Sequence, residues 1–403
     1  MALPAPRKAN RQAWPPLLTL TDDLLEDVFL RVPTPADLSR ACIACATFRR
    51  IITGLSFLRR FRAIHPPPLL GFIPWEESGF LPAQPPYPSA PLARAVAEAA
   101  DFSYSFVPDG KWNKPWSPWV SCDVRQGRVL LKCCRVHDDI SMSPLDVELV
   151  VCDPIFRRYV VLPPLPGDLV VAHDDPNSGL GHLLAPTGED EEETSFRLIF
   201  TAANHANLVA FVYSSVTGHC ISQLEFSGHC LAVLLGRLLR PDYSQGCFFW
   251  TSLWRERSLV LDSTRMEFSI VHNVPYRLNK LDSGGPAIFV GAEGTPEMFF
   301  LSHSHDLLQF HVKSRNEPSD RWQLRGTIPL PGHYYKYYVI LGAAEGFLFI
   351  RAMCSFKHPC DCCFLDTKTR ELKKVCGCRC ANNQDCLSCA NAFFGFPPSL
   401  SRA

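Results

Sequence analysis

Hydrophobic residues near the start of the chain recur with the spacing of amphipathic helices. Thr21 suits a helix N-cap, and Pro33 ends the first apolar stripe. A second apolar repeat, at three- and four-residue steps, begins after Thr34 and stops at Gly54, and a shorter third one covers residues 57–64. We therefore predict three short helices within residues 19–65. The apolar positions of the first stripe are Leu24, Leu25, Val28, Phe29 and Val32.

The pattern changes beyond residue 66. Prolines interrupt residues 74–91, and from about Trp119 short apolar runs alternate with turn residues, as strands do. Three runs share one plan, in which an apolar strand leads to an aspartate, a tight turn with a basic residue, and a second strand. The three aspartates are Asp153, Asp262 and Asp366, spaced by about twice a unit of roughly 50 residues. Weaker copies lie midway, at residues 212–219 and 309–315.

Repeated strand-rich units of this length are typical of a β-propeller, whose blades leave only short, protected edges. The alternative is a set of unrelated hairpins in a sandwich or an open sheet. We expect a multidomain chain with a flexible proline-rich leader (1–18), a small all-α unit (19–65) and an all-β propeller-like repeat domain (66–403).

Length and charge agree with this organisation and disfavour some functions. A chain of 403 residues exceeds the size at which one core normally stops growing. The 40 basic and 40 acidic residues give no net field that would attract nucleic acid or an anionic membrane. No secretory signal and no apolar run of the roughly 20 residues needed for a membrane span is present. We expect a protein of the nucleus or cytoplasm, whose 18 cysteines would be thiols or metal ligands.

Residues 20–61 resemble the F-box. The resemblance rests on the opening Leu20-Thr-Asp-Asp-Leu-Leu, the turn Leu30-Arg-Val-Pro, and the segments Ala36-Asp-Leu, Ala44-Cys-Ala-Thr-Phe-Arg-Arg and Phe57-Leu-Arg-Arg-Phe. Usual members have proline where this chain has Thr21, and often tryptophan where it has Phe48. The chain from Pro68 onward is similar, less closely, to the F-box-associated domain of the large plant F-box families. That similarity lies in Pro68-Leu-Leu-Gly-Phe, Val151-Cys-Asp-Pro with Leu162-Pro-Pro-Leu-Pro, and Gly342-Ala-Ala-Glu-Gly.

The resemblance implies docking to the Skp-family adaptor of an SCF (cullin-RING) ubiquitin ligase, and through it to the cullin. The repeat domain would then bind a protein substrate, with no cofactor and no catalysis by this chain. Three short helices also have more apolar surface than they can cover alone, which indicates a partner. The candidate adaptor-binding residues are Leu20, Leu24, Leu25, Val28, Leu30, Leu38, Cys45, Phe48 and Leu58.

Two alternatives stay open. One is that the helices only cap the repeat domain. The other is a β-propeller interaction scaffold that belongs to no ligase. Such a scaffold could bind zinc, because nine of the 18 cysteines lie within residues 354–389 and thiolates are good zinc ligands. Their irregular spacing favours a segment of reduced thiols. The zinc candidates are Cys376, Cys378, Cys380, Cys386 and Cys389.

Overall fold

The computed structural model of the chain forms two compact units, Met1–Pro67 and Pro68–Ala403. The predicted leader, residues 1–18, lies outside the described residues. The structure describes residues 20–33, 35–65, 67–74, 79–110, 119–134, 147–164, 180–185, 195–203, 207–227, 241–251, 257–272, 286–291, 295–302, 307–313, 322–331, 335–344, 346–354, 360–378 and 390–395.

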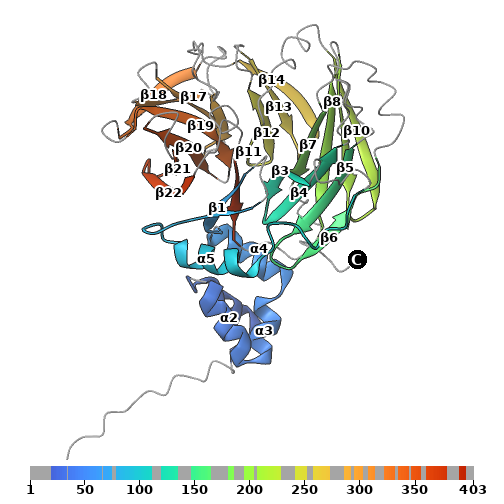
Figure 1. The fold of residues 1–403 in the computed structure, drawn as a ribbon. Helices are drawn as coiled ribbons and strands as arrows, with labels where there is room; N and C mark the ends of the chain where they lie inside the picture. Colours follow the sequence, from blue (N-terminus) through green and yellow to red (C-terminus); the bar gives the residue numbers. More distant parts are fainter. Residues whose placement is uncertain are drawn as a thin grey trace, which may run out of the picture. The chain divides into compact units, whose positions relative to one another are not determined.

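The first unit contains four helices in its described part, one more than predicted. The single helix expected between Thr34 and Gly54 is divided at Cys45, whose backbone is extended (φ −151°, ψ 137°). The Arg49 side chain donates a 3.2 Å hydrogen bond to the carbonyl of Cys42, one of the carbonyls left without a helical partner where the helix ends. Apolar spacing continues across this break, so periodicity alone did not reveal it. The helices are α1 (Asp22–Leu30), α2 (Pro35–Ala44), α3 (Ala46–Ile52) and α4 (Leu55–Ile64) (Figure 1).

The four helices bury a small apolar core. The rings of Phe29 and Phe48 meet edge to face with centroids 5.1 Å apart, which is a favourable aromatic geometry. Ion pairs between α1 and the other helices are exposed, so burial of the apolar side chains supplies most of the stability. The buried members of this core are Leu25, Phe29, Leu30, Leu38, Ile51, Ile52, Phe57 and Phe61.

The second unit is a β-propeller of six blades, which confirms the predicted propeller (Figure 1). Five blades are four-stranded antiparallel sheets whose strands follow one another along the chain. The strands of the first two are β3 (Val120–Arg125), β4 (Arg128–Cys134), β5 (Val147–Asp153), β6 (Arg158–Val161), β7 (Leu180–Ala185), β8 (Arg197–Ala203), β9 (Asn207–Ser214) and β10 (His219–Ser227). The other three contain β11 (Asp242–Ser244), β12 (Cys247–Thr251), β13 (Arg257–Asp262), β14 (Glu267–His272), β15 (Ala287–Val290), β16 (Pro296–Leu301), β17 (Leu307–Lys313), β18 (Trp322–Pro329), β19 (Tyr337–Ala344), β20 (Phe347–Met353), β21 (Cys360–Asp366) and β22 (Leu372–Cys378).

The sixth blade joins the two ends of the repeat domain. It pairs β1 (Leu69–Pro74) with β2 (Leu81–Pro82) on one side and with β23 (Ala390–Phe394) on the other. The register places Phe72 opposite Ala392. This pairing closes the ring, because a strand from the end of the domain completes the blade that begins it. A short helix, α5 (Ala90–Ala99), packs on β1 and β2.

The repeated aspartates form the outer hairpins of three blades. Asp153 accepts hydrogen bonds from the backbone N–H groups of Ile155 and Phe156, at 3.0 and 3.1 Å. Asp262 and Asp366 make the same pair of bonds to the residues two and three positions on. The aspartate carboxylate thus accepts hydrogen bonds from backbone N–H groups that have no strand partner in the turn, as its place in the repeat predicts.

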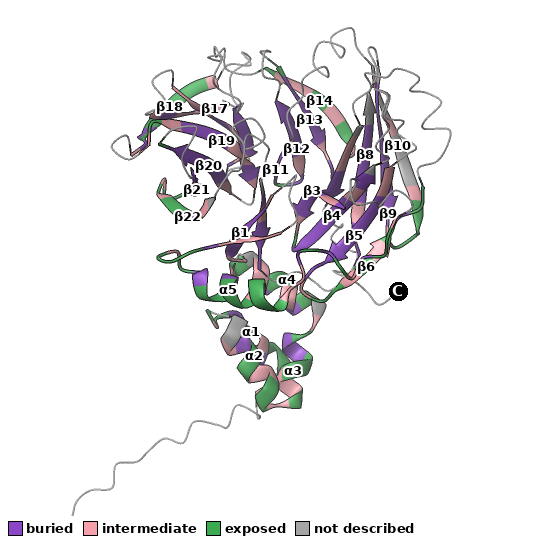
Figure 2. Cartoon of the chain, in the orientation of Figure 1, coloured by how far each residue is buried: buried purple, intermediate pink, exposed green. Residues whose placement is uncertain are grey.

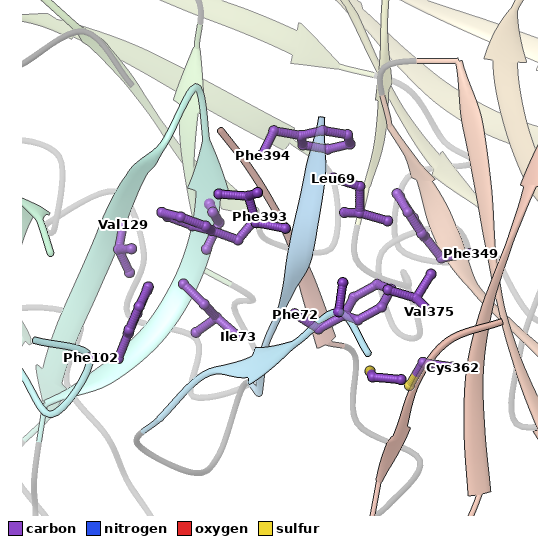
Figure 3. Close-up of a cluster of buried hydrophobic side chains, with 14 of the residues drawn as sticks. Leu69, Phe72, Ile73, Phe102, Val129, Phe349, Cys362, Val375, Phe393 and Phe394 are labelled. Carbon is purple, nitrogen blue, oxygen red and sulfur yellow. The ribbon is translucent and has the colours of Figure 1, made fainter. Parts of the chain in front are cut away.

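The propeller core lies between the blades. Inner and middle strands are buried, whereas the outer strands β6, β14, β18 and β22 carry exposed positions (Figure 2). The closing strands contribute the fully buried Phe72 and Phe393, which lie among side chains of the neighbouring blades (Figure 3). Among the helices that the structure describes, none is long and apolar enough to cross a membrane.

Candidate functional site

The nine apolar residues expected at an adaptor interface lie in three environments of the helical unit. Leu24 and Val28 are exposed, by 52% and 42%. The remaining residues contribute partly or wholly to packing. Leu25, Leu30 and Leu38 are buried in the core, and Leu20, Cys45, Phe48 and Leu58 are half-buried.

Leu24 and Val28 form one apolar strip on α1, because residues four apart lie on the same face of a helix. Their neighbours in sequence, Leu25 and Phe29, face the core. The apolar stripe of α1 is therefore wider than the part of it that the described helices of this unit bury. Ile43, near the end of α2, is 79% exposed and was not among the predicted residues, since it lies outside the matched motif positions.

Two acidic residues of α1 form ion pairs with arginines of other helices. Arg50 of α3 contacts Asp22 at 2.7 Å, and Arg60 of α4 contacts Glu26 at the same distance. These pairs place α1 against α3 and α4. As exposed pairs they contribute little to stability, so their main effect is to orient α1.

The cysteine-rich segment contains closely spaced sulfur atoms. Cys376 of β22 lies opposite Cys362 of β21, and the two buried thiols are hydrogen-bonded. This bond, with the Arg351 guanidinium as a smaller cause, lowers the pKa of Cys362, and the same bond raises the pKa of Cys376. Cys360 forms a disulfide, so the expectation that every cysteine is a thiol or metal ligand is wrong at this residue. The expectation followed from the reducing interior of the cell alone. It did not consider that neighbouring strands rich in cysteine bring thiols close together.

The predicted zinc ligands are only partly within the described residues. Cys376 is buried and bonded to Cys362. Cys380, Cys386 and Cys389 lie outside the described residues, as does the side chain of Cys378. Among the residues that are described, no three His, Cys, Asp or Glu side chains are grouped so as to hold a metal ion.

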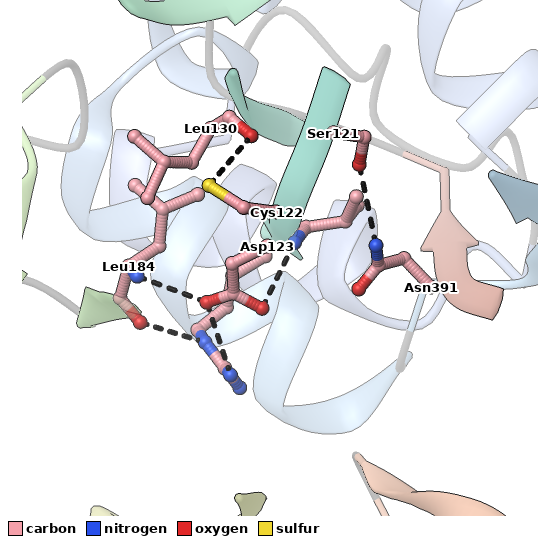
Figure 4. Close-up of polar contacts among 8 residues, drawn as sticks. Ser121, Cys122, Asp123, Leu130, Leu184 and Asn391 are labelled. Atoms are coloured by element: carbon pink, nitrogen blue, oxygen red, sulfur yellow. Dashed lines mark hydrogen bonds and ion pairs between the residues drawn. The ribbon is translucent and has the colours of Figure 1, made fainter. Parts of the chain in front are cut away.

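A small cavity opens in the propeller between β3, β11, β19 and β23, with a volume of about 60 Å³. On β3, Asp123 accepts a 2.9 Å bond from the Leu184 N–H (Figure 4). Arg125, two residues on, donates a 2.8 Å bond to the Leu184 carbonyl. The Arg125 guanidinium also lies 4.1 Å from the centroid of the Tyr243 ring, which is a cation–π contact. Arg125 therefore connects three blades.

A second buried carboxylate lines the same cavity. Asp242 of β11 accepts bonds from the N–H groups of Ile288 on β15, at 3.1 Å, and Ala343 on β19, at 2.7 Å. Gly342 is next to it with φ +145°, and a Cβ there would lie 3.1 Å from the Asp242 carboxylate. Both carboxylates thus join inner strands through charge-assisted hydrogen bonds.

Sequence reasoning did not identify Asp123, Arg125 or Asp242. The available signal was a charged residue inside an apolar strand, as in Ser121-Cys-Asp-Val, since such a residue must find buried partners. The described lining of the cavity contains no serine, cysteine or histidine. The Arg125 side chain is nearly buried, and its guanidinium bonds to the Leu184 carbonyl and to Asp123, so it holds the blades together.

Comparisons with known proteins identify no family. No family model matches the chain, and no curated protein is similar to it. Solved structures that resemble it include a chain from a study of two prolyl endopeptidases, with 12% identity, TM-score 0.35, and coverage of 64% of this chain and 34% of that chain. Another is from a nidogen/laminin complex, with 8% identity, TM-score 0.36, and coverage of 70% and 86%. A luciferin-regenerating enzyme has 11% identity, TM-score 0.30, and coverage of 70% and 81%. The propeller assignment therefore rests on the strand order of this chain.

Proposed function

We propose that this chain is the substrate-recognition subunit of an SCF ubiquitin ligase. In this proposal the helical unit is an F-box that binds the Skp-family adaptor, and the propeller binds the protein to be ubiquitinated. The observation that carries the proposal is the exposed strip of Leu24 and Val28 on α1, in a unit whose other α1 leucines are buried. A propeller also supports a protein-interaction scaffold in general, because its closed ring holds many loops and strand edges on a rigid frame.

The proposed mechanism is positional. The adaptor, and through it the cullin, would be held at one unit while the other holds the target. Linking two binding sites raises the effective concentration of the bound groups, so ubiquitin transfer would gain rate without chemistry in this chain. A cofactor has no part in such a mechanism.

The test is the affinity of the full chain for a purified Skp-family adaptor, measured by isothermal titration calorimetry. Leu24→Asp and Val28→Asp should each weaken binding about tenfold or more, because each places a charge in a desolvated contact. Ile64→Asp is the matched control, since Ile64 is 56% exposed in the same unit but lies on α4. Leu38→Asp is unsuitable, because Leu38 is buried and the variant would disturb folding.

Two outcomes would contradict the proposal. One is that the wild-type chain does not bind the adaptor, which would leave the non-ligase scaffold as the better description. The other is that Leu24→Asp and Val28→Asp bind as tightly as the Ile64→Asp control. Circular dichroism of each variant would show that the helices are retained.

A further inference from the structure

The outer strand β6 of one blade exposes only apolar side chains, whereas the exposed side chains of the outer strands β14 and β22 are polar. Glu267 and Ser269 are exposed on β14, and Lys373 is exposed on β22. Charged and polar side chains at such positions prevent unwanted strand pairing. On β6 the exposed positions are instead Tyr159 and Val161, at 39% and 53%. This edge lacks the usual protection along its exposed face.

One side of the β6 backbone pairs with no strand among those that the structure describes. The Leu162 N–H donates a 3.0 Å bond to the Leu149 carbonyl, in register with β5. Bonded and non-bonded residues alternate along an antiparallel pair, so the N–H and C=O groups of Tyr159 and Val161 point away from β5. Because β6 is the last strand of its sheet among the described residues, these groups face the open edge. The same two residues thus present apolar side chains and backbone hydrogen-bonding groups.

Positive charge lies at the start of this edge. Phe156, in the turn before β6, is 51% exposed, and the Arg158 guanidinium is 5.9 Å from the centroid of its ring. Arg157 is exposed, with φ 52°. The aspartate of this hairpin, Asp153, is fully buried in the turn and presents no charge at the surface. We name Phe156, Arg157, Tyr159 and Val161 the β6 patch.

We propose that the β6 patch binds an extended acidic segment of a partner protein, which adds to the blade as a fifth strand. Backbone bonds to Tyr159 and Val161 would supply affinity, and apolar side chains of the segment would pack on the same two residues. Acidic side chains would lie near the exposed Arg157. A second copy of this chain is a poorer occupant, because it would bring its own arginines to the same edge. The inference deepens the proposed function by naming the chemistry of the recognised target.

The probe is a short synthetic peptide of alternating glutamate and valine, blocked at both ends and labelled with fluorescein. Its binding to the full chain is followed by fluorescence anisotropy. Two further peptides carry N-methyl groups on every valine or on every glutamate, which removes one or the other set of backbone donors. We expect one of these two to lose about tenfold in affinity, or 1.4 kcal/mol, and a peptide with lysine in place of glutamate to bind more weakly than the acidic one.

Variants of the β6 patch test whether the peptide binds at this edge. Tyr159→Lys and Val161→Lys should each weaken peptide binding about tenfold, and Arg157→Gln should weaken it less. Leu324→Lys is the matched control, because Leu324 is 55% exposed on the outer strand β18 of another blade. It should bind the peptide as the wild type does.

The proposal is overturned if the peptide does not bind, if both N-methylated peptides bind like the parent, or if Val161→Lys matches the Leu324→Lys control. Sedimentation that shows a dimer lost on Val161→Lys would identify a second copy as the occupant and would also overturn it. Adaptor binding of the Val161→Lys variant is measured in parallel. Since that variant leaves α1 unchanged, it should still bind the adaptor. Loss of peptide binding alone would therefore concern the β6 patch, and loss of adaptor binding in the wild type would concern the proposed function.

Discussion

The helical unit and the propeller differ in how they use apolar surface. The helical unit has a small core and leaves Leu24 and Val28 exposed on the helix whose neighbouring positions form that core. The propeller encloses its apolar residues between blades, and most of its exposed strand positions are polar. In the proposed function a partner covers this exposed part of the helical unit. The propeller closes its ring by pairing β1 with β23 and exposes apolar groups only locally, as on β6.

Ring closure provides the largest expected effect. Phe393 on β23 is fully buried, with its ring 5.3 Å from that of Phe102 and 5.6 Å from that of Phe80. Phe393→Ala should lower the free energy of unfolding of the propeller by about 3 to 5 kcal/mol, through lost burial and a cavity. Thermal unfolding by calorimetry measures the change. Phe156→Ala, at an exposed phenylalanine of the same unit, should change it by less than about 0.5 kcal/mol. Equal effects would show that closure is not what stabilises the ring.

Two adjacent leucines of α1, one exposed and one buried, should differ in their effect on stability. Leu25→Ala should destabilise the four helices by about 2 to 4 kcal/mol, because Leu25 is 1% exposed in a core that cannot refill the space. Leu24→Ala should have little effect on stability and act only on adaptor binding. Hydrogen exchange of the helix amides in the full chain distinguishes the two. A stability loss at Leu24 as large as that at Leu25 would contradict the assignment of the exposed strip.

Acid should weaken the propeller through a partly buried histidine. Burial, with a smaller effect of Lys132, lowers the pKa of His182 to about 4, and its Nε2 atom is buried without a hydrogen-bond partner among the described residues. The folded state therefore binds fewer protons than the unfolded state, and stability is complete above about pH 6.5. It should fall as the pH decreases from 6.5 to 4, by at most about 3 kcal/mol. Urea unfolding across this range should show the slope, and His182→Gln should remove it. An unchanged slope in that variant would assign it to other groups.

The hairpin aspartates give the smallest expected effect. Asp262→Ala removes two backbone hydrogen bonds from an exposed turn and should cost about 1 kcal/mol. Asp262→Asn retains an acceptor oxygen and should recover most of the loss, as measured by urea unfolding. A loss in Asp262→Asn equal to that in Asp262→Ala would show that the charge, and not the acceptor, supports the turn.

The hairpins of the repeat domain were predictable, because each is marked by residues that are close together in the sequence. The spacing of Asp153, Asp262 and Asp366 indicated equivalent hairpins, and the structure forms the same turn at each. The number of blades was not predictable. It depends on the pairing of β1 with β23, two strands from opposite ends of the domain that carry no mutual sequence signal.

Site residues were less predictable for two physical reasons. Helical periodicity placed Leu24 and Leu25 in one apolar stripe, but only the packing of α3 and α4 determines which of them is exposed. The cavity residues Asp123 and Asp242 are defined by bonds to backbone groups of other blades, so no local pattern reveals their partners. The break at Cys45 was missed because the apolar spacing does not change there.

Photo-crosslinking from α1 tests the central claim most directly. A photoreactive amino acid is placed at position 24, 28 or 64 of the full chain, which is then mixed with a purified Skp-family adaptor and irradiated. The account predicts cross-links to the adaptor from positions 24 and 28 and few from position 64. No cross-link from α1, or equal cross-linking from all three positions, would contradict it.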